Sequence, residues 1–205
     1  MTSQLRIARL MTRAFALVAA FVLVACSRKE SAMRDTTAAA ETAAAPAAPP
    51  AAPAPNDAQI AHIAVTANSI DSTAGAMAVQ KGSAKDVKDF GRMMVKDHGA
   101  VNKQAVALVK KLNVTPEDNE TSRNLMSSAE QSRSSMQGMT GAAFDRAYID
   151  NEVMFHQTVL DALDKTLIPN SQNAELKALL EKVRPNVAGH LERAKQIQST
   201  LGAAQ

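Results

Sequence analysis

The sequence predicts an all-α protein whose folded part is an antiparallel up-down bundle of helices. From residue 57 onward, apolar residues recur every three or four positions over long segments, which is the spacing of one face of a helix. No run of alternating β-branched residues bounded by turn residues appears there, so we expect no strands. The breaks between the periodic segments are short, and helices joined by short loops run antiparallel.

Five helices are expected, over about residues 58–81, 84–112, 118–137, 141–168 and 172–202. Gly82 ends the first helix, because glycine is the preferred residue just after a helix. The apolar seam of this first helix consists of Ile63, Ala67, Ile70, Ala74 and Met77. The third helix is rich in serine and is the most polar of the five. A four-helix bundle with one additional helix therefore accounts for all the periodic segments.

The last two helices are separated by Pro169 and Asn170, which we expect to end the fourth helix. The fifth helix carries Pro185 in its interior. Since proline has no N–H group for the carbonyl of Glu181, we expect a bend there.

The first 25 residues are typical of a secretory signal peptide, with a positively charged start and an apolar run over residues 14–25 that is too short to span a bilayer. The run ends in LVAC at residues 23–26, which resembles the lipobox of bacterial lipoproteins. The resemblance implies that Cys26 is lipidated after cleavage. Serine rather than aspartate follows this cysteine, which implies the periplasmic side of the outer membrane.

Residues 26–56 begin with Cys26 and consist mostly of Ala, Pro, Ser and Thr. Such a composition cannot build a core, so we expect a disordered tether. The domain organisation is then a signal peptide over 1–25, a lipidated linker over 26–56 and a helical bundle over 57–205. The expected localisation is the periplasm, anchored to the outer membrane.

Outside the signal segment the chain carries no net charge, because Arg6, Arg9 and Arg13 equal the formal net charge of +3. No basic field remains to attract nucleic acid, and the chain contains no Trp and few aromatic residues on which bases could stack. We therefore expect no nucleic-acid partner, and contact with the membrane only through the lipid on Cys26. No particular protein partner or oligomeric state is indicated.

Three of the four histidines fall on or beside apolar seams. His98 and His190 occupy seam positions of the second and fifth helices, and His156 lies about 80° around the fourth helix from Tyr148, on the flank of its seam. Each lies near the middle of its helix, so antiparallel packing brings all three to one height. His62 lies off the seam of the first helix.

Two interpretations of these histidines remain open. Buried histidines commonly form polar networks that fix helix register, and Tyr148 is an available partner. Alternatively, imidazoles from facing helices bind a transition metal ion as a cofactor, with Glu152 or Asp97 supplying a carboxylate. Glu152 precedes His156 by four residues and so shares its helix face.

Three stretches resemble the bacterial family of domain-of-unknown-function 4142: VKDFGRMMVKDHGAVNKQ (Val87–Gln104), FDRAYIDNEVMFHQTVLDAL (Phe144–Leu163) and LKALLEKVRPNVAGHLERAKQIQ (Leu176–Gln198). The resemblance covers nearly all of residues 57–203. It implies a ferritin-like helical bundle that is usually exported, and no agreed activity. Ferritin-like di-iron sites use Glu-x-x-His pairs, and no acidic residue stands three positions before any histidine here. We therefore expect no ferroxidase or oxygenase chemistry.

No catalytic residue is indicated, because the chain has no phosphate-binding glycine loop, no G-x-S-x-G or H-E-x-x-H motif and no cysteine in its folded part. The sequence favours a non-enzymatic binding protein of the cell envelope, active in its maintenance or in stress tolerance. A metal-binding or metal-buffering protein is the alternative. An enzyme is a further alternative, and it would require a cavity lined by the histidines and open to solvent.

Overall fold

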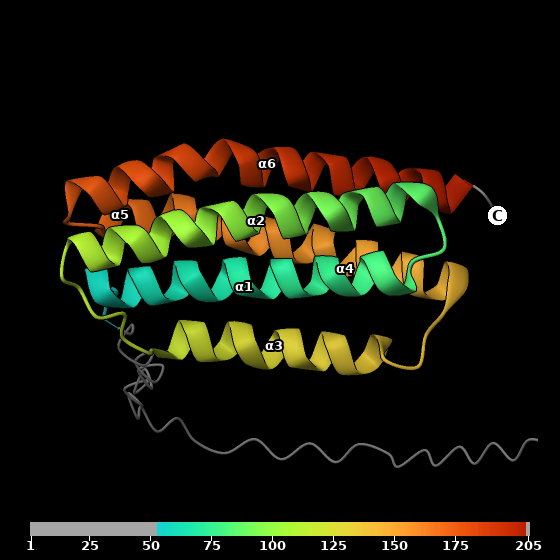
Figure 1. Cartoon of the computed structure of the whole chain (residues 1–205), viewed down its shortest axis with the longest axis horizontal. Helices are drawn as coiled ribbons and strands as arrows, with labels where there is room; N and C mark the ends of the chain where they lie inside the picture. The colour runs from blue at the N-terminus through green and yellow to red at the C-terminus, as the bar shows by residue number, and fades with distance from the viewer. Residues whose placement is uncertain (1–52, 204–205) are drawn as a thin grey trace, which may run out of the picture. The chain divides into compact units, whose positions relative to one another are not determined.

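The structure, a computed structural model, describes residues 53–203 of the chain. Every regular element in that range is helical, and it contains no strand. The elements are α1 (Asp57–Lys81), α2 (Lys85–Lys111), α3 (Glu120–Met136), α4 (Gly141–Ala162), η1 (Leu163–Leu167), α5 (Ile168–Asn170) and α6 (Ala174–Ala203). The predicted all-α class and its five helices are confirmed, with α4, η1 and α5 forming the fourth (Figure 1).

Two predictions concern residues outside the part of the chain that the structure describes. The signal peptide, with Cys26 following it, and the linker up to residue 52 are not among residues 53–203. Within that range no helix has the length and apolar character needed to cross a membrane.

The third helix lies on the outside of a four-helix bundle, as Figure 1 shows. At one end, the side-chain amide of Asn119 donates to the carbonyl of Gln59, 3.3 Å away. At the other end, Lys81 Nζ donates to the carbonyl of Met136, 2.8 Å away. Helix α3 therefore runs parallel to α1 along its whole length.

This placement determines the topology of the bundle. The five helices alternate in direction along the chain. Because α3 runs with α1 and connects α2 to α4 as a crossover, the four bundle helices α1, α2, α4 and α6 run up, down, down and up. A single long crossover of this kind characterises ferritin-like bundles.

Two buried or half-buried carboxylates tie the ends of the bundle together. Asp145 of α4 accepts hydrogen bonds from the backbone N–H groups of Ser83 at 2.9 Å and Ala84 at 2.7 Å, and from the Ser83 hydroxyl. Ser83 and Ala84 lie at the start of α2, where backbone N–H groups have no partner inside the helix. At the opposite end, Asp57 of α1 accepts from two backbone N–H groups in the turn 171–173, each at 2.9 Å.

Helices α1 and α2 pack unusually closely through two glycines. A Cβ atom on Gly75 would lie 2.6 Å from the carbonyl oxygen of Gly91, and one on Gly91 would lie 2.7 Å from the carbonyl oxygen of Gly75. Real Cβ atoms essentially never approach a backbone atom so closely. The pair of glycines therefore sets the distance between these helices.

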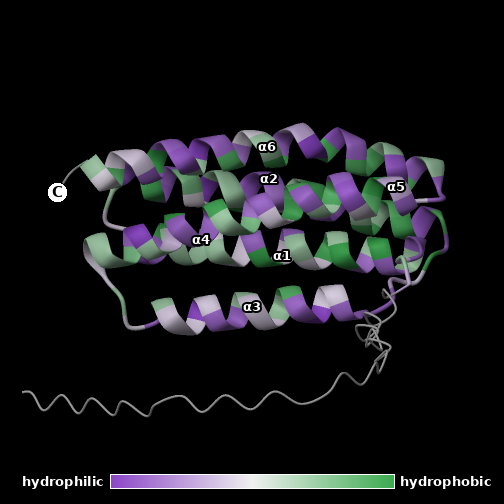
Figure 2. Ribbon diagram, turned by 180° about the vertical axis from the view of Figure 1, so that it is seen from behind, coloured by the Kyte–Doolittle hydropathy of each residue, from purple (hydrophilic) through white to green (hydrophobic). Residues whose placement is uncertain are grey.

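The bundle has an apolar core at each end and a polar layer between them. One core contains Phe90, Met94, Phe144, Tyr148 and Ile197 among its members. The other is built from Ile60, Ile63, Leu163, Leu167, Leu176, Leu180 and Val187. Figure 2 shows hydrophobic and hydrophilic residues mixed along every helix, which is what burial of one face requires.

The structure corrects the predicted inner face of the first helix. Ile63 and Ala67 are buried as expected, but Ile70, Ala74 and Met77 are only half-buried. The positions that are buried instead include Asp71, Gly75 and Ala78. The close approach through Gly75 turns this face of α1 toward α2 and carries Asp71 into the interior.

The end of the fourth helix also differs from the prediction. The helix does not stop before Pro169 but widens into one turn of π-helix, η1, and continues through α5 to Asn170. Helix α6 is continuous past Pro185, and Figure 1 shows it arched over the bundle.

Candidate functional site

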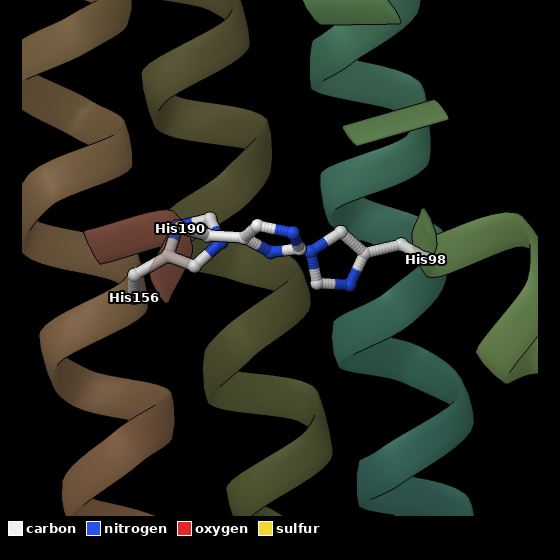
Figure 3. A group of neighbouring side chains, drawn as sticks. All are labelled: His98, His156 and His190. Carbon is white, nitrogen blue, oxygen red and sulfur yellow. The ribbon is translucent and has the colours of Figure 1, made fainter. Parts of the chain in front are cut away.

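Three histidines from three helices meet in the polar layer. His98 comes from α2, His156 from α4 and His190 from α6, and Figure 3 shows the three rings side by side. The ring centroids lie 5.1 Å apart for His98 and His190, 5.5 Å for His156 and His190, and 5.6 Å for His98 and His156. The exposed fractions are 5% for His98, 0% for His156 and 7% for His190.

In each ring, one nitrogen forms a hydrogen bond with an oxygen atom that lies away from the other two rings. His98 Nδ1 lies 2.9 Å from the amide oxygen of Asn68, and His156 Nδ1 lies 3.0 Å from the backbone carbonyl oxygen of Glu152. His190 Nε2 lies 3.2 Å from Oδ2 of Asp97. Amide and carbonyl oxygens only accept, and a carboxylate does the same, so these nitrogens carry the proton.

The second nitrogen of each ring is buried and has no hydrogen-bond partner. These atoms are His98 Nε2, His156 Nε2 and His190 Nδ1. One nitrogen from each ring lies within 4.8 Å of the others. The three rings therefore come together in the interior with one unpaired nitrogen each, and buried polar atoms without a partner are rare enough to need an explanation.

All three rings are held in the neutral form. Burial, together with the neighbouring His156 and His190, lowers the pKa of His98 to about 3. Burial lowers the pKa of His156 to about 4, and it also lowers the pKa of His190. Neutral imidazole is the form that binds a metal ion.

Two buried carboxyl groups adjoin the histidines. Asp71 of α1 is 2% exposed and Glu152 of α4 is fully buried. Asp71 Oδ2 lies 3.4 Å from His98 Nε2 and 4.0 Å from His156 Nε2, and neither contact is a hydrogen bond. One oxygen of each carboxyl group and one nitrogen of His156 lie within 4.8 Å of one another.

The two carboxyl groups resist ionisation. Burial raises the pKa of Asp71 well above its ordinary value. Burial also raises the pKa of Glu152, and the charge of Asp71 raises it further. Glu152 Oε2 lies 3.5 Å from His156 Nδ1, and the same carboxyl group adjoins Asp71 and the hydroxyl of Tyr148.

The remaining predicted residues lie at the border of this layer. Asp97 is half-exposed and bonds His190, not the adjacent His98. Tyr148 is fully buried, stacked on Phe144 at 6.1 Å and edge-on to Phe90 at 6.2 Å. Its hydroxyl makes no contact with a histidine nitrogen but adjoins the carboxyl group of Glu152, and burial together with that group raises the pKa of Tyr148.

The sequence interpretation missed Asn68 and Asp71, both on α1. The available signal was spacing, because Asp71 lies eleven residues after the buried Ile60, which brings it to nearly the same face of the helix. The predicted apolar seam of this helix contained Ile70 and Ala74 instead, and it did not include Asp71.

A cavity of about 100 Å³ adjoins the histidines. His98, His190, Asp71 and Asn68 form part of its wall, whereas His156 and Glu152 do not. Most of the remaining wall is apolar and includes Ile63, Ala67, Val101, Leu125, Val159, Ala162, Leu163, Leu167, Leu180, Val183 and Val187. A cavity beside the histidines is a requirement of an enzyme and equally of a site that only binds a ligand.

Comparison with known proteins identifies a family. A family model described as "Domain of unknown function (DUF4142)" matches residues 41–197. No curated protein and no solved structure matches the chain.

Proposed function

The chain belongs to the DUF4142 family, whose description names no activity, and from the geometry of the histidine layer we propose that it is a non-enzymatic metal-binding protein of the cell envelope. His98, His156 and His190 are the proposed ligands of one transition metal ion. Asp71 supplies a negative charge beside that ion, and the fully buried Glu152 adjoins Asp71 and His156.

The observation that carries this proposal is the set of three buried ring nitrogens without a hydrogen-bond partner. A polar network would pair these atoms with donors, and the structure pairs none of them. A metal ion accepts all three lone pairs at once, which removes the cost of burying them unpaired.

The outward bonds of the three rings support the same proposal. Histidines that bind metals usually donate their other ring N–H to a carboxylate, a carbonyl or a similar oxygen, which fixes the orientation of the ring. His98 has an amide oxygen in this position, His156 a backbone carbonyl and His190 a carboxylate. The three rings are thus oriented before any ion arrives.

The donor set favours a borderline divalent ion. Imidazole suits Zn²⁺, Cu²⁺, Ni²⁺ and Co²⁺ better than Mg²⁺ or Ca²⁺, which prefer an all-oxygen site. Three histidines also leave at least one coordination position for a further ligand.

Elemental analysis tests the proposal. The full chain, purified in detergent and dialysed against Zn²⁺ or Co²⁺, should retain about one ion per chain, and His98→Ala, His156→Ala and His190→Ala should each lose most of it. His62→Ala is the matched control, because His62 lies on α1 outside the cluster, and it should retain the ion. Absence of bound metal in the wild-type chain, or equal retention by all four variants, would refute the proposal.

A lipid anchor is the second part of the proposal, and it rests on the sequence LVAC at residues 23–26. Cys26→Ala should release the exported protein from the membrane fraction into the soluble periplasmic fraction, because the acyl chains that hold it are missing. Cys26→Ala protein that still sediments with the outer membrane would contradict this anchor.

A further inference from the structure

The cavity beside the histidine layer has two chemically different ends. His98, His190, Asp71 and Asn68 form its polar end together with Asp97, and the rest of its wall is mainly aliphatic apart from Thr121, Thr158 and Asn186. The cavity lies on the side of the layer where the core of Ile63, Leu163, Leu167 and Leu180 begins. A molecule inside it would meet the histidines at one end and hydrocarbon elsewhere.

Two departures from regular α-helix border this cavity. The π-helical turn η1 contributes Leu163 and Leu167 to the wall, and such turns are frequent at functional sites. On the facing helix α6, Pro185 lies between the wall residues Val183 and Val187. The π-helical turn and the proline, which lacks a backbone N–H, therefore both lie beside the cavity, at positions away from the histidines themselves.

We propose that this cavity holds the hydrocarbon tail of a short-chain aliphatic monocarboxylate, whose carboxylate group binds the metal ion on the three histidines. This inference rests on the proposed function, because it requires the ion. The ligand would occupy the coordination position that three histidines leave open.

The volume and the wall limit the size and type of the tail. An apolar cavity of about 150 Å³ accommodates one benzene molecule, so about 100 Å³ accommodates a tail of about three to five carbon atoms. The mainly aliphatic wall favours a hydrocarbon tail, since burying an unpaired hydroxyl or amide against it is unfavourable.

The charge of the site favours an anionic head group. A divalent ion bound by three neutral imidazoles brings two positive charges into a buried layer, where charge is unfavourable unless it is compensated, and Asp71 beside the ion compensates only one of them. A carboxylate compensates part of that charge, whereas an alcohol of equal length does not.

Cobalt provides the readout, because its visible d–d bands respond to a change of ligand. The full chain loaded with Co²⁺ is titrated with butanoate, acetate and 1-butanol. Butanoate should change the d–d spectrum at concentrations about tenfold lower than acetate, because each buried CH₂ contributes about 0.8 kcal/mol. 1-Butanol should produce no such change.

Two variants that fill the cavity test its role. Ala67→Leu on α1 and Ala162→Leu at the end of α4 each place a larger side chain into the wall, and Ala107→Leu on the exposed face of α2 is the matched control. Both cavity variants should keep the d–d bands of bound Co²⁺ and lose the preference for butanoate over acetate. Ala107→Leu should keep both properties.

The outcomes separate this inference from the proposed function. Absence of d–d bands in the wild-type chain would refute metal binding itself. Intact bands with equal responses to butanoate and acetate, or a tenfold preference that survives in both cavity variants, would overturn the cavity inference alone. A response to 1-butanol as strong as that to butanoate would overturn the carboxylate head group.

Discussion

At the scale of single residues, the polar layer contains two kinds of titratable group, and burial shifts their pKa values in opposite directions. Burial keeps His98, His156 and His190 unprotonated, and it keeps Asp71 and Glu152 from ionising. In the absence of an ion the layer therefore holds as little charge as these residues permit. The histidines and the carboxyl groups should therefore make the stability of the folded chain depend on pH in opposite directions.

For the histidines, stability should be lost as the pH falls. The ordinary pKa of His156 is 6.5 and burial lowers it to about 4, so between these values the unfolded chain binds a proton that the folded chain does not. Its contribution is complete above about pH 6.5 and decreases toward pH 4. Between pH 7 and pH 5, the free energy of unfolding of the metal-free wild type should fall by about 2 kcal/mol more than that of His156→Gln.

Urea unfolding at the two pH values measures this difference. His62→Gln, outside the cluster, should follow the wild type. Parallel losses in the wild type and His156→Gln would show that the buried ring does not contribute to the pH dependence.

For the carboxyl groups, stability should be lost as the pH rises. The folded chain keeps the proton of Glu152 to a higher pH than the unfolded chain does, because its pKa is raised. This contribution is present below the unfolded pKa and disappears as the pH rises through the folded pKa. Metal-free Glu152→Gln should therefore be more stable than the wild type at pH 8, with the advantage shrinking toward pH 4, as followed by urea unfolding. A variant less stable than the wild type at pH 8 would mean that the carboxylate is stabilising there.

At the scale of helices, the contact between α1 and α2 positions part of the site. The two glycines at positions 75 and 91 bring the backbones together, and this approach holds Asn68 and Asp71 of α1 against His98 of α2. A change far from the ring can therefore alter the site through the distance between helices.

Gly91→Ala should destabilise the protein although alanine is the better helix former. The new Cβ would lie 2.7 Å from the carbonyl oxygen of Gly75, and forcing such groups apart costs about 1–3 kcal/mol, more than the roughly 1 kcal/mol gained in helix propensity. Gly99→Ala, on the same helix with no atom within 4 Å of its Cβ, should instead stabilise by about 0.5–1 kcal/mol. Chemical denaturation compares the two, and equal effects would rule out the close helix contact.

At the scale of the whole molecule, the site links three of the four bundle helices. His98, His156 and His190 lie on α2, α4 and α6, and the remaining helix α1 reaches the layer through Asp71. An ion bound there contacts side chains from three bundle helices and lies beside a carboxyl group from the fourth. It therefore stabilises the whole bundle and not a single pair of helices.

Metal should therefore raise the melting temperature of the entire bundle. At a free concentration about 100 times the Kd, binding stabilises by about 2.7 kcal/mol, which corresponds to about 5–10 °C for a domain of this size. Circular dichroism should show one transition that shifts with Zn²⁺ in the wild type and does not shift in His190→Ala. A shift of the same size in that variant would place the ion elsewhere.

The sequence by itself determined the class of fold and the location of the helices. Helix periodicity and breaking residues such as Gly82 act locally, so they can be identified without knowing which helices are neighbours. The same periodicity indicated that His98 and His190 face inward, and that Glu152 shares a face with His156. Three stretches of sequence were also enough to indicate the family.

Only the tertiary structure decided which groups complete the polar layer and which helix stays outside the bundle. Asn68 and Asp71 join the site because α1 and α2 approach through Gly75 and Gly91, a contact between residues on different helices. The cavity depends likewise on wall residues from several separate helical segments. Periodicity describes one helix at a time, whereas the distance and rotation between helices follow from packing, and packing is settled only when all the helices meet.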